Sequence, residues 1–220
     1  MKTFFLLLFG LLSGLLCAGA AGGAGFDCKA AASVTEKRIC SDPALSHMDE
    51  ALAAAYRTAL ASMDDANRKT AAAAQKAWLN KTRSLCDDTA CLRDVYATRI
   101  QLLAHCAGMC SDTVEAYAHG GDTYNLVTLL DAQSRNASFN ASLARRKLAP
   151  ISGCTTVVDA AVGTARGNHS FGGLCRVKGG SGFVMVCNDL MIGHFGYAQA
   201  PAGATRNDLA DFTIDNCFGG

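Results

Sequence analysis

The stretch between residues 44 and 60 repeats apolar side chains with the period of a helix that buries one face. The members of this stripe are Leu45, Met48, Leu52, Tyr56 and Leu60. Asp42 and Pro43 come directly before it, and a capping Asp followed by Pro at the first helical position is a typical helix start. The pattern therefore predicts a long helix that begins at Asp42.

Two more long helices are expected in the same segment. One follows Asp64-Asp65, whose negative charges suit a helix N-terminus, and runs past Trp78 towards Cys86. Another begins near Asp88, where apolar side chains again recur at helical spacing: Leu92, Val95, Tyr96, Ile100 and Leu103. Residues 26–105 are thus expected to form a helical domain with three main helices.

The pattern changes in the second half of the chain, residues 108–220. Gly is absent between Gly25 and Gly108, so most of the 22 glycines lie outside the helical segment. Residues 114–148 are expected to hold one or two helices, because Leu126, Leu129 and Leu130 have helical spacing. The chain as a whole then reads as α+β: a helical bundle followed by a small β-containing domain rich in Gly and Cys.

Short apolar runs after Pro150 predict strands. They cover residues 157–162, 171–177, 183–187, 191–197 and 212–217. The second and third of these are expected to form a hairpin around Gly179-Gly180-Ser181-Gly182. Asn188-Asp189 is expected to turn the chain again, since both residue types favour tight turns.

The N-terminus, residues 1–24, has the features of a secretory signal peptide. Lys2 precedes an apolar run over residues 3–16, and small residues follow. The run is short for a transmembrane helix, which needs about 20 apolar residues. Leu15 and Leu16 precede Cys17, which argues against a lipid anchor on that cysteine, because lipoprotein signals place a small residue there. We expect a periplasmic or secreted protein.

Removal of the signal leaves an even number of cysteines, which in an exported chain predicts a disulfide framework. The ten are Cys28, Cys40, Cys86, Cys91, Cys106, Cys110, Cys154, Cys175, Cys187 and Cys217. The first four can gather at one end of the helical hairpin, and two of the others are equidistant from Ser181 in the expected β-hairpin. The favoured pairs are Cys40–Cys86, Cys28–Cys91 and Cys175–Cys187.

Composition and motifs argue against several functions. The net charge is +1, and Arg145-Arg146-Lys147 is the one basic cluster, so nucleic-acid binding is not expected. The sequence has no Gly-x-Ser-x-Gly, His-Glu-x-x-His or phosphate-binding loop, and His169 beside Ser170 would point to the opposite face of a strand. His105-Cys106-x-x-x-Cys110 could hold zinc, but export favours disulfides. We expect no enzyme, no cofactor and no metal.

Three ordered blocks resemble the N-terminal domain of the lysozyme inhibitor LprI family. The first runs from Asp27-Cys28 through Cys40-Ser41-Asp42-Pro43 to Tyr56. The second is Gln75-Lys76-Ala77-Trp78-Leu79 with Arg83 and Cys86, and the third is Cys91-Leu92-x-x-x-Tyr96-x-x-Arg99-Ile100-x-x-Leu103. Arg83 lies one residue further from the tryptophan than the family pattern expects, and one residue turns a helix by about 100°.

This resemblance implies an exported, disulfide-linked helical domain of the bacterial cell envelope. Some members of the family are associated with lysozyme inhibition, so the first hypothesis is an inhibitor or binding protein for a lysozyme-like, peptidoglycan-cleaving enzyme. Lysozymes are usually basic, and an acidic patch facing a cleft would favour this hypothesis. The alternative is an envelope structural or interaction module without inhibitory activity.

Candidate contact residues for such a partner are expected on exposed turns of the second half. Asn188, Asp189 and His194 are the candidates, with Asp189 facing a basic group of the enzyme. Trp78 is a further candidate, because tryptophan is frequent at binding hot spots, but its apolar neighbours favour a core position.

Overall fold

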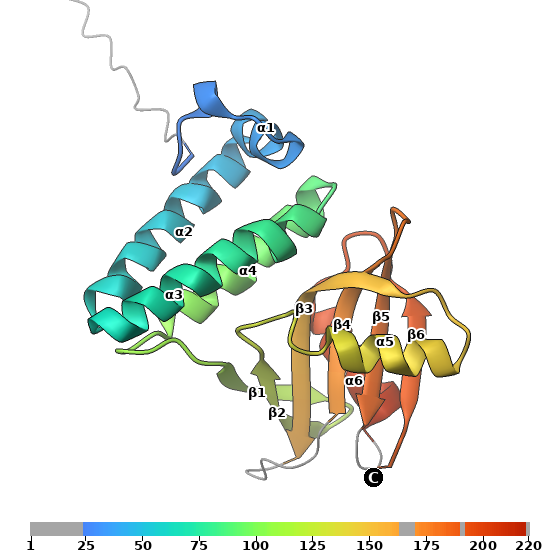
Figure 1. Ribbon diagram of the computed structural model, residues 1–220. Helices are drawn as coiled ribbons and strands as arrows, with labels where there is room; N and C mark the ends of the chain where they lie inside the picture. Colours follow the sequence, from blue (N-terminus) through green and yellow to red (C-terminus); the bar gives the residue numbers. More distant parts are fainter. Residues whose placement is uncertain (1–23, 163–169, 190–191, 219–220) are drawn as a thin grey trace, which may run out of the picture.

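The computed structural model describes residues 24–162, 170–189 and 192–218 (Figure 1). Nearly all of the predicted signal peptide, including Cys17, lies outside the described residues. So do Asn168-His169, similar in composition to the expected contact turns, and Met191, the first residue of the strand expected over residues 191–197. The structure is α+β, as the sequence predicted, with a helical part that precedes a strand-rich part. No helix of the described residues is long and apolar enough to span a membrane.

The helical part consists of one short and three long α-helices. They are α1 (Val34–Ser41), α2 (Pro43–Ala61), α3 (Asp65–Ala77) and α4 (Thr89–Ala104), preceded by the 3-10 turn η1 (Cys28–Ala30). Asp42, Asp64 and Asp88 cap the three long helices by accepting hydrogen bonds from backbone N–H groups of the first turn. All three predicted helix starts are confirmed.

The predicted apolar stripes meet in the core of the bundle. Leu45, Leu52, Leu92 and Tyr96 are buried there, at most 3% exposed. The core also takes in Trp78, which lies where α3 passes into a π-helical turn, η2 (Trp78–Thr82). A 3-10 turn, η3 (Arg83–Leu85), then leads to α4.

The strand-rich part is built on a six-stranded antiparallel sheet. Its strands are β1 (Thr113–His119), β2 (Asp122–Thr128), β3 (Ile151–Val162), β4 (Ser170–Val177), β5 (Phe183–Asp189) and β6 (Phe195–Gln199). They pair in chain order, so that every strand lies beside its sequence neighbour. The predicted hairpin between residues 171–177 and 183–187 is confirmed as β4 and β5.

One helix covers each face of this sheet. On one face, α5 (Asn136–Arg145) packs Phe139 and Leu143 against the side of β3 that carries Val157. On the other face, α6 (Arg206–Cys217) packs against the side of β3 that carries Val158. Because successive side chains of a strand point to opposite faces, this part has three layers, with α5 in front of the sheet in Figure 1 and α6 behind it.

Two interpretations of apolar spacing are wrong. Residues 114–148 were expected to hold one or two helices, and one, α5, lies there. The leucine spacing at residues 126–130 on which this rested is not helical: Leu126 lies in β2, where Tyr124, Leu126 and Thr128 are buried with the period of a strand. Residues 212–217 were expected as a strand and lie in α6, which begins at a capping box between Thr205 and Asp208. Both runs are short, and periodicity alone does not separate helix from strand over so few residues.

All ten described cysteines form disulfides, but the favoured pairs are wrong. The five bridges are Cys28–Cys40, Cys86–Cys91, Cys106–Cys110, Cys154–Cys175 and Cys187–Cys217. In the helical part each bridge joins neighbours in the sequence, for which loop closure costs little entropy. In the sheet, Cys175 lies opposite Val184 on one side and Cys154 on the other, so it pairs across β3 and β4.

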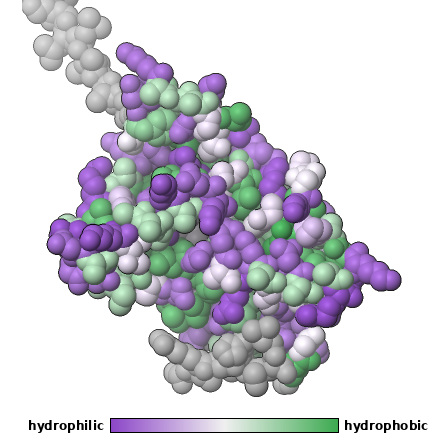
Figure 2. All heavy atoms as spheres, viewed as in Figure 1, coloured by the Kyte–Doolittle hydropathy of each residue, from purple (hydrophilic) through white to green (hydrophobic). Residues whose placement is uncertain are grey.

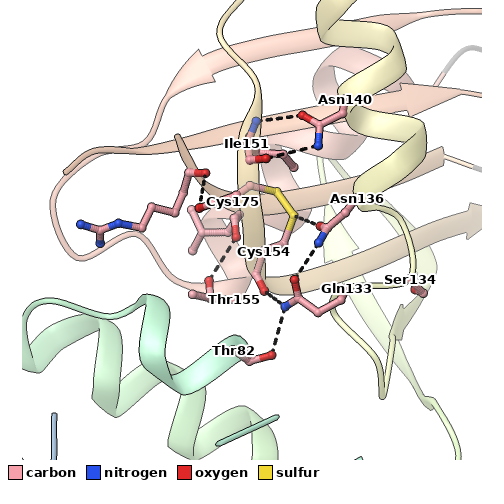
Figure 3. Close-up of a disulfide and its surroundings, with 12 residues drawn as sticks. Thr82, Gln133, Ser134, Asn136, Asn140, Ile151, Cys154, Thr155 and Cys175 are labelled. Atoms are coloured by element: carbon pink, nitrogen blue, oxygen red, sulfur yellow. Dashed lines mark hydrogen bonds between the residues drawn. A yellow bond between two sulfur atoms is a disulfide. The ribbon is translucent and has the colours of Figure 1, made fainter. Parts of the chain in front are cut away.

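Polar side chains join the helical part to the sheet. Gln133 donates from Nε2 to the carbonyl oxygen of Cys154 at 2.7 Å and lies 3.1 Å from the hydroxyl of Thr82 (Figure 3). Asn136 donates to the Oε1 atom of Gln133 at 2.7 Å, which fixes the orientation of the amide. The η2 turn is thereby held against the loop that leads into α5.

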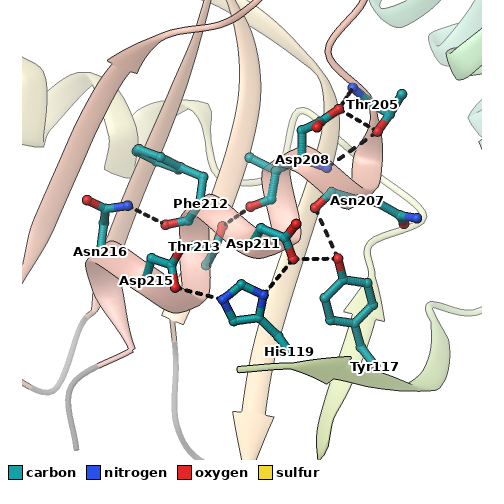
Figure 4. Close-up of polar contacts among 11 residues, drawn as sticks. Tyr117, His119, Thr205, Asn207, Asp208, Asp211, Phe212, Thr213, Asp215 and Asn216 are labelled. Atoms are coloured by element: carbon teal, nitrogen blue, oxygen red, sulfur yellow. Dashed lines mark hydrogen bonds and ion pairs between the residues drawn. The ribbon is translucent and has the colours of Figure 1, made fainter. Parts of the chain in front are cut away.

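The β1–β2 hairpin is fastened to α6 by a second polar cluster (Figure 4). His119 contacts Asp211 through Nδ1 at 2.9 Å and Asp215 through Nε2 at 2.7 Å. Tyr117 donates its hydroxyl proton to Asp211 at 2.6 Å. We call these four side chains the hairpin clasp, because they connect elements about 95 residues apart in the chain.

Candidate functional site

The polar residues of the LprI-like blocks form a buried network inside the helices. Tyr96 donates to Asp49 at 2.5 Å, and the backbone N–H of Gly25 donates to the other oxygen of that carboxylate at 2.8 Å. Burial and the bond to Asp49 raise the pKa of Tyr96 above its ordinary value of 10.0. Asp49 and Tyr96 are almost inaccessible, so this part of the network stabilises the fold rather than contacting a partner.

Arg83 reaches this network despite its displaced position. Its Nη1 donates to the Tyr96 hydroxyl at 3.3 Å. The preceding η2 turn closes with a bond from the N–H of Arg83 to the carbonyl oxygen of Trp78, five residues back instead of four. A π turn holds one more residue than an α turn, so it accommodates the extra residue that separates Arg83 from the tryptophan.

Trp78 belongs to the core and not to the surface. Its side chain is 7% exposed and meets Tyr96 edge to face at 5.4 Å between ring centroids. Arg99 lies over its ring at 5.9 Å and donates from Nε to Gln75 at 3.0 Å. Burial lowers the pKa of Arg99 to about 10. Of the two roles considered for Trp78, the structure supports packing.

Asn188 and Asp189 are buried, at 4% and 5% exposed, so the expectation that they form an exposed turn is wrong. Strand β5 continues through Asp189, and the turn comes after it, closed by the bond from the N–H of Gly193 to the Asp189 carbonyl oxygen. The Asn188 amide donates to Ser138 at 3.0 Å. His194 is exposed beyond this turn.

A hollow of about 260 Å³ lies where the N-terminus of α4 meets the sheet and the β6–α6 loop. Asp87, Asp88 and Asp94 line it from the helical part, and Leu174 and Phe183 line it from the sheet. We call it the acidic hollow. The Cys86–Cys91 bridge closes the turn that carries Asp87 and Asp88, which holds two of the three carboxylates in place.

The three carboxylates differ in their surroundings. Asp87 pairs with Arg176 at 2.7 Å, and this contact lowers the pKa of the carboxyl group below its usual value. Asp88 accepts from the N–H of Cys91 at 2.8 Å as the helix cap. Asp94 accepts from the N–H of Arg206 at 3.4 Å with one oxygen.

The second oxygen of Asp94 is buried without a hydrogen-bond partner among the described residues. Burial also raises the pKa of Asp94 above its ordinary value. A buried carboxylate oxygen that lacks a donor is unfavourable, and a donor supplied by a ligand would remove that penalty. With three carboxylates in its wall, of which Asp87 is paired with Arg176, the acidic hollow is suited to receive a cationic side chain.

No sequence pattern marks these three acids as the wall of a cavity. Asp88 was visible as a helix cap, and Asp87 was visible between two cysteines, but neither signal points to a cavity. The opposite wall comes from residues about 60 or more positions further along the chain, so the hollow exists only in the folded protein. Among the described residues, no group of three or more His, Cys, Asp or Glu side chains is arranged so that it could hold a metal ion.

Comparison with known proteins gives a match to a protein family, and this match covers the helical part. No curated protein matches the chain, and no solved structure matches it. Residues 28–114 match the family model described as Lysozyme inhibitor LprI. This match begins at Cys28 and extends past α4 to the first residues of β1. It contains the side chains of the buried network and the three acids of the hollow. The helical segment of this chain is therefore an LprI-like segment, joined to a strand-rich part.

Proposed function

We propose that this protein is exported to the bacterial cell envelope and there binds and inhibits a lysozyme-like, peptidoglycan-cleaving enzyme. The observation that carries the proposal is the match of residues 28–114 to an inhibitor family. In this proposal residues 1–24 are removed as a signal peptide. Residues 26–105 are the LprI-like domain, and residues 108–220 form a second, non-catalytic domain.

The five disulfides support a role outside the cytoplasm. Bridges persist in oxidising compartments such as the periplasm, where proteases also act on loosely folded chains. Cross-links restrict the unfolded chain, and a rigid surface loses less entropy when it binds. An inhibitor that must outlast an extracellular enzyme benefits from both effects.

The acidic hollow is the proposed contact with the enzyme. Lysozymes are usually basic, and a concentrated negative patch accelerates the encounter with a basic partner. The chain is close to neutral overall, so such steering must come from a local patch. A lysine or arginine of the enzyme would enter the hollow between Asp88 and Asp94, with its aliphatic part on Phe183.

His194 is the proposed contact from the strand-rich part. It is exposed on the β5–β6 turn, whereas Asn188 and Asp189 lie beneath the turn and hold its shape. The proposal for these two residues is accordingly one of support and not of direct contact.

A lysozyme-inhibition assay with the oxidised mature protein tests the proposal. The variant Asp87→Asn/Asp88→Asn removes two charges from the rim and keeps the helix cap, because Asn caps helices as well as Asp does. We expect inhibition to weaken about tenfold, which corresponds to about 1.4 kcal/mol. The control Glu50→Gln/Asp65→Asn removes the same charge from exposed positions of α2 and α3 and should inhibit like the wild type.

One result would contradict the proposed contact surface, and another would contradict the inhibitory function itself. Equal inhibition by both variants would remove the acidic hollow from the contact. Failure of the wild type to inhibit any hen-type or goose-type lysozyme would favour the second candidate function, an envelope interaction module. That candidate draws support from the extent of the family match, which leaves the larger part of the chain uncovered.

A further inference from the structure

A second and larger hollow, of about 610 Å³, lies between the C-terminal end of α5 and the β5–β6 turn. Arg145, Arg146 and His194 line it, and Phe195 and Ser142 contribute to its wall. Pockets that take small ligands usually have volumes of about 300–1,000 Å³. We call this feature the cationic hollow. It lies on the strand-rich part and shares no lining residue with the acidic hollow.

The two guanidinium groups are held in place without being neutralised. Arg146 lies over the ring of Phe195 at 4.1 Å, and Arg145 donates to the hydroxyl of Ser142 at 2.9 Å. Neither arginine forms an ion pair with a carboxylate in the part of the chain that the structure describes. Figure 2 shows strongly hydrophilic residues projecting from the side of the molecule on which α5 ends in Figure 1.

Lys147 follows the two arginines as a third consecutive cation. Its backbone conformation is one that a lysine rarely adopts. The helix ends in a Schellman motif, with bonds from the N–H of Leu148 to the carbonyl oxygen of Leu143 and from the N–H of Lys147 to that of Ala144. Lys147 occupies the left-handed position of this motif, with φ 57°, and it is the one described non-glycine residue with a positive φ. Glycine is the usual residue there, because a Cβ atom is strained in this conformation.

The helix dipole accounts for part of this charge, because cations are stabilised in the last turn of a helix. The helix dipole does not explain why a lysine occupies the left-handed position. It also does not explain why an exposed histidine lies on a separate turn opposite the end of the helix. Arg145, Arg146 and His194 line one cavity, with Lys147 next in the chain, and together they point to an anion that the cavity receives.

The walls also indicate which kind of anion fits. Arginine forks match the planar geometry of a carboxylate through two parallel hydrogen bonds. Asp189 lies in the same wall, with its oxygens accepting from the N–H of Ile192 at 3.0 Å and the hydroxyl of Ser170 at 3.3 Å. Its buried negative charge lowers the local potential, which disfavours a dianion such as phosphate more than a monoanion.

We propose that the cationic hollow binds an organic carboxylate, carried on a saccharide or on a peptide. Arg145 and Arg146 hold the carboxylate at the rim, and Ser142 and its neighbours in the wall offer polar groups to the remainder of the ligand. This site gives the strand-rich part a binding role of its own; it shares His194 with the proposed enzyme contact, and carboxylate binding is measured separately from inhibition.

Calorimetric titration of the oxidised protein tests the site with four probes. N-acetylmuramic acid carries the carboxylate on a sugar, and the dipeptide Ala-Glu carries it on a peptide. N-acetylglucosamine is the neutral sugar, and inorganic phosphate is the alternative anion. We expect saturable binding of at least one carboxylate probe, and the stronger of the two identifies the carrier. The neutral sugar and phosphate should bind at least tenfold more weakly.

Two variants and one control variant separate binding from folding. Arg145→Gln/Arg146→Gln should weaken carboxylate binding at least tenfold, while Lys178→Gln, on the exposed β4–β5 turn, should leave it unchanged. Lys147→Gly should weaken binding severalfold and raise the midpoint of thermal unfolding by about 2–4 °C, since it relieves strain as it removes charge. A loss of binding in this variant cannot then be attributed to misfolding.

Three results would overturn the proposal. One is the absence of saturable binding by both carboxylate probes. Another is binding of the neutral sugar as tightly as the acidic one, which would show that the charge is not recognised. The third is binding of phosphate more tightly than either carboxylate, which would contradict the choice of a monoanion.

Discussion

Asp159 should make the stability of this protein depend on pH in a predictable direction. It lies in β3 on the same face of the sheet as Val157, and one of its oxygens is buried without a hydrogen-bond partner among the described residues. Burial raises its pKa to about 7, although Arg135 partly offsets this effect. Arg135 lies over the ring of Phe171 at 3.6 Å, and Phe171 is opposite Asp159 in the neighbouring strand.

The magnitude follows from the difference between the folded and unfolded pKa values. The folded value lies roughly three pH units above the ordinary 3.8, and each unit corresponds to about 1.4 kcal/mol, which gives an upper bound of about 4 kcal/mol. The side chain is only partly buried, so solvent screens the charge, and we reduce the expected effect to about 2 kcal/mol.

The direction is fixed by the sign of the difference. A raised pKa means that the folded state holds the proton more tightly than the unfolded chain does. The stabilisation is therefore complete below about pH 4 and is lost as the pH rises through about 7. Asp159→Asn removes the ionisable group, so it should raise the free energy of unfolding at pH 8 by about 2 kcal/mol and change little at pH 4.

Urea denaturation of the oxidised protein at pH 4, 6 and 8 measures this effect. The control Asp122→Asn removes the same charge from an exposed position at the start of β2 and should be nearly neutral at all three values. An Asp159→Asn variant that is equally stabilised at pH 4 and pH 8 would refute the reasoning. So would a loss of stability at pH 8, which would mean that the ionised carboxylate is favourable where it lies.

Two further predictions concern packing and the hairpin clasp. Gly172→Ala would place a Cβ atom 1.8 Å from the hydroxyl oxygen of Thr213 on α6, so we expect a loss of at least about 1–3 kcal/mol in urea denaturation, whereas Gly180→Ala, with its nearest contact at 3.6 Å, should be tolerated. Hydrogen bonds to the carboxylates of α6 raise the pKa of the His119 imidazole above its ordinary value of 6.5, and the bond to Asp215 has the largest effect. The clasp therefore stabilises the hairpin fully below pH 6.5, and this stabilisation is lost as the pH rises through the pKa of His119 in the folded protein. Amide exchange in the β1–β2 hairpin should become faster over this pH range. In the variant His119→Gln, this pH dependence should be absent.

Local signals predicted the helical part well, because a helix start is specified within a few residues. Asp42, Asp64 and Asp88 each cap a helix through their own first turn, and the apolar stripes fix which face is buried. The strand-rich part needed information that no short window contains. Residues 206–217 form a helix that packs on β3, β4, β5 and β6, and a six-residue apolar run does not reveal this packing.

The disulfide pairing and the candidate sites were hidden for a related reason. Cys175 has a possible partner on each side, and strand register alone decides between them. Asn188-Asp189 has the composition of a turn, but β5 extends through both residues, and the chain turns later. Both hollows are walled by segments distant in the sequence, so their residues carry no shared local pattern.

The order of the disulfides has a consequence for how the chain matures. Among the ten described cysteines, the first pairs with the second, the third with the fourth, and so on to the end. If the chain crosses a membrane from its N-terminus, as its proposed export implies, the cysteines emerge one after another. The next cysteine to emerge after the first member of each pair is its native partner. Oxidation in the order of emergence thus gives the native connectivity directly, without the thiol–disulfide exchange that crossed pairings need, and maturation depends on an oxidant more than on an isomerase.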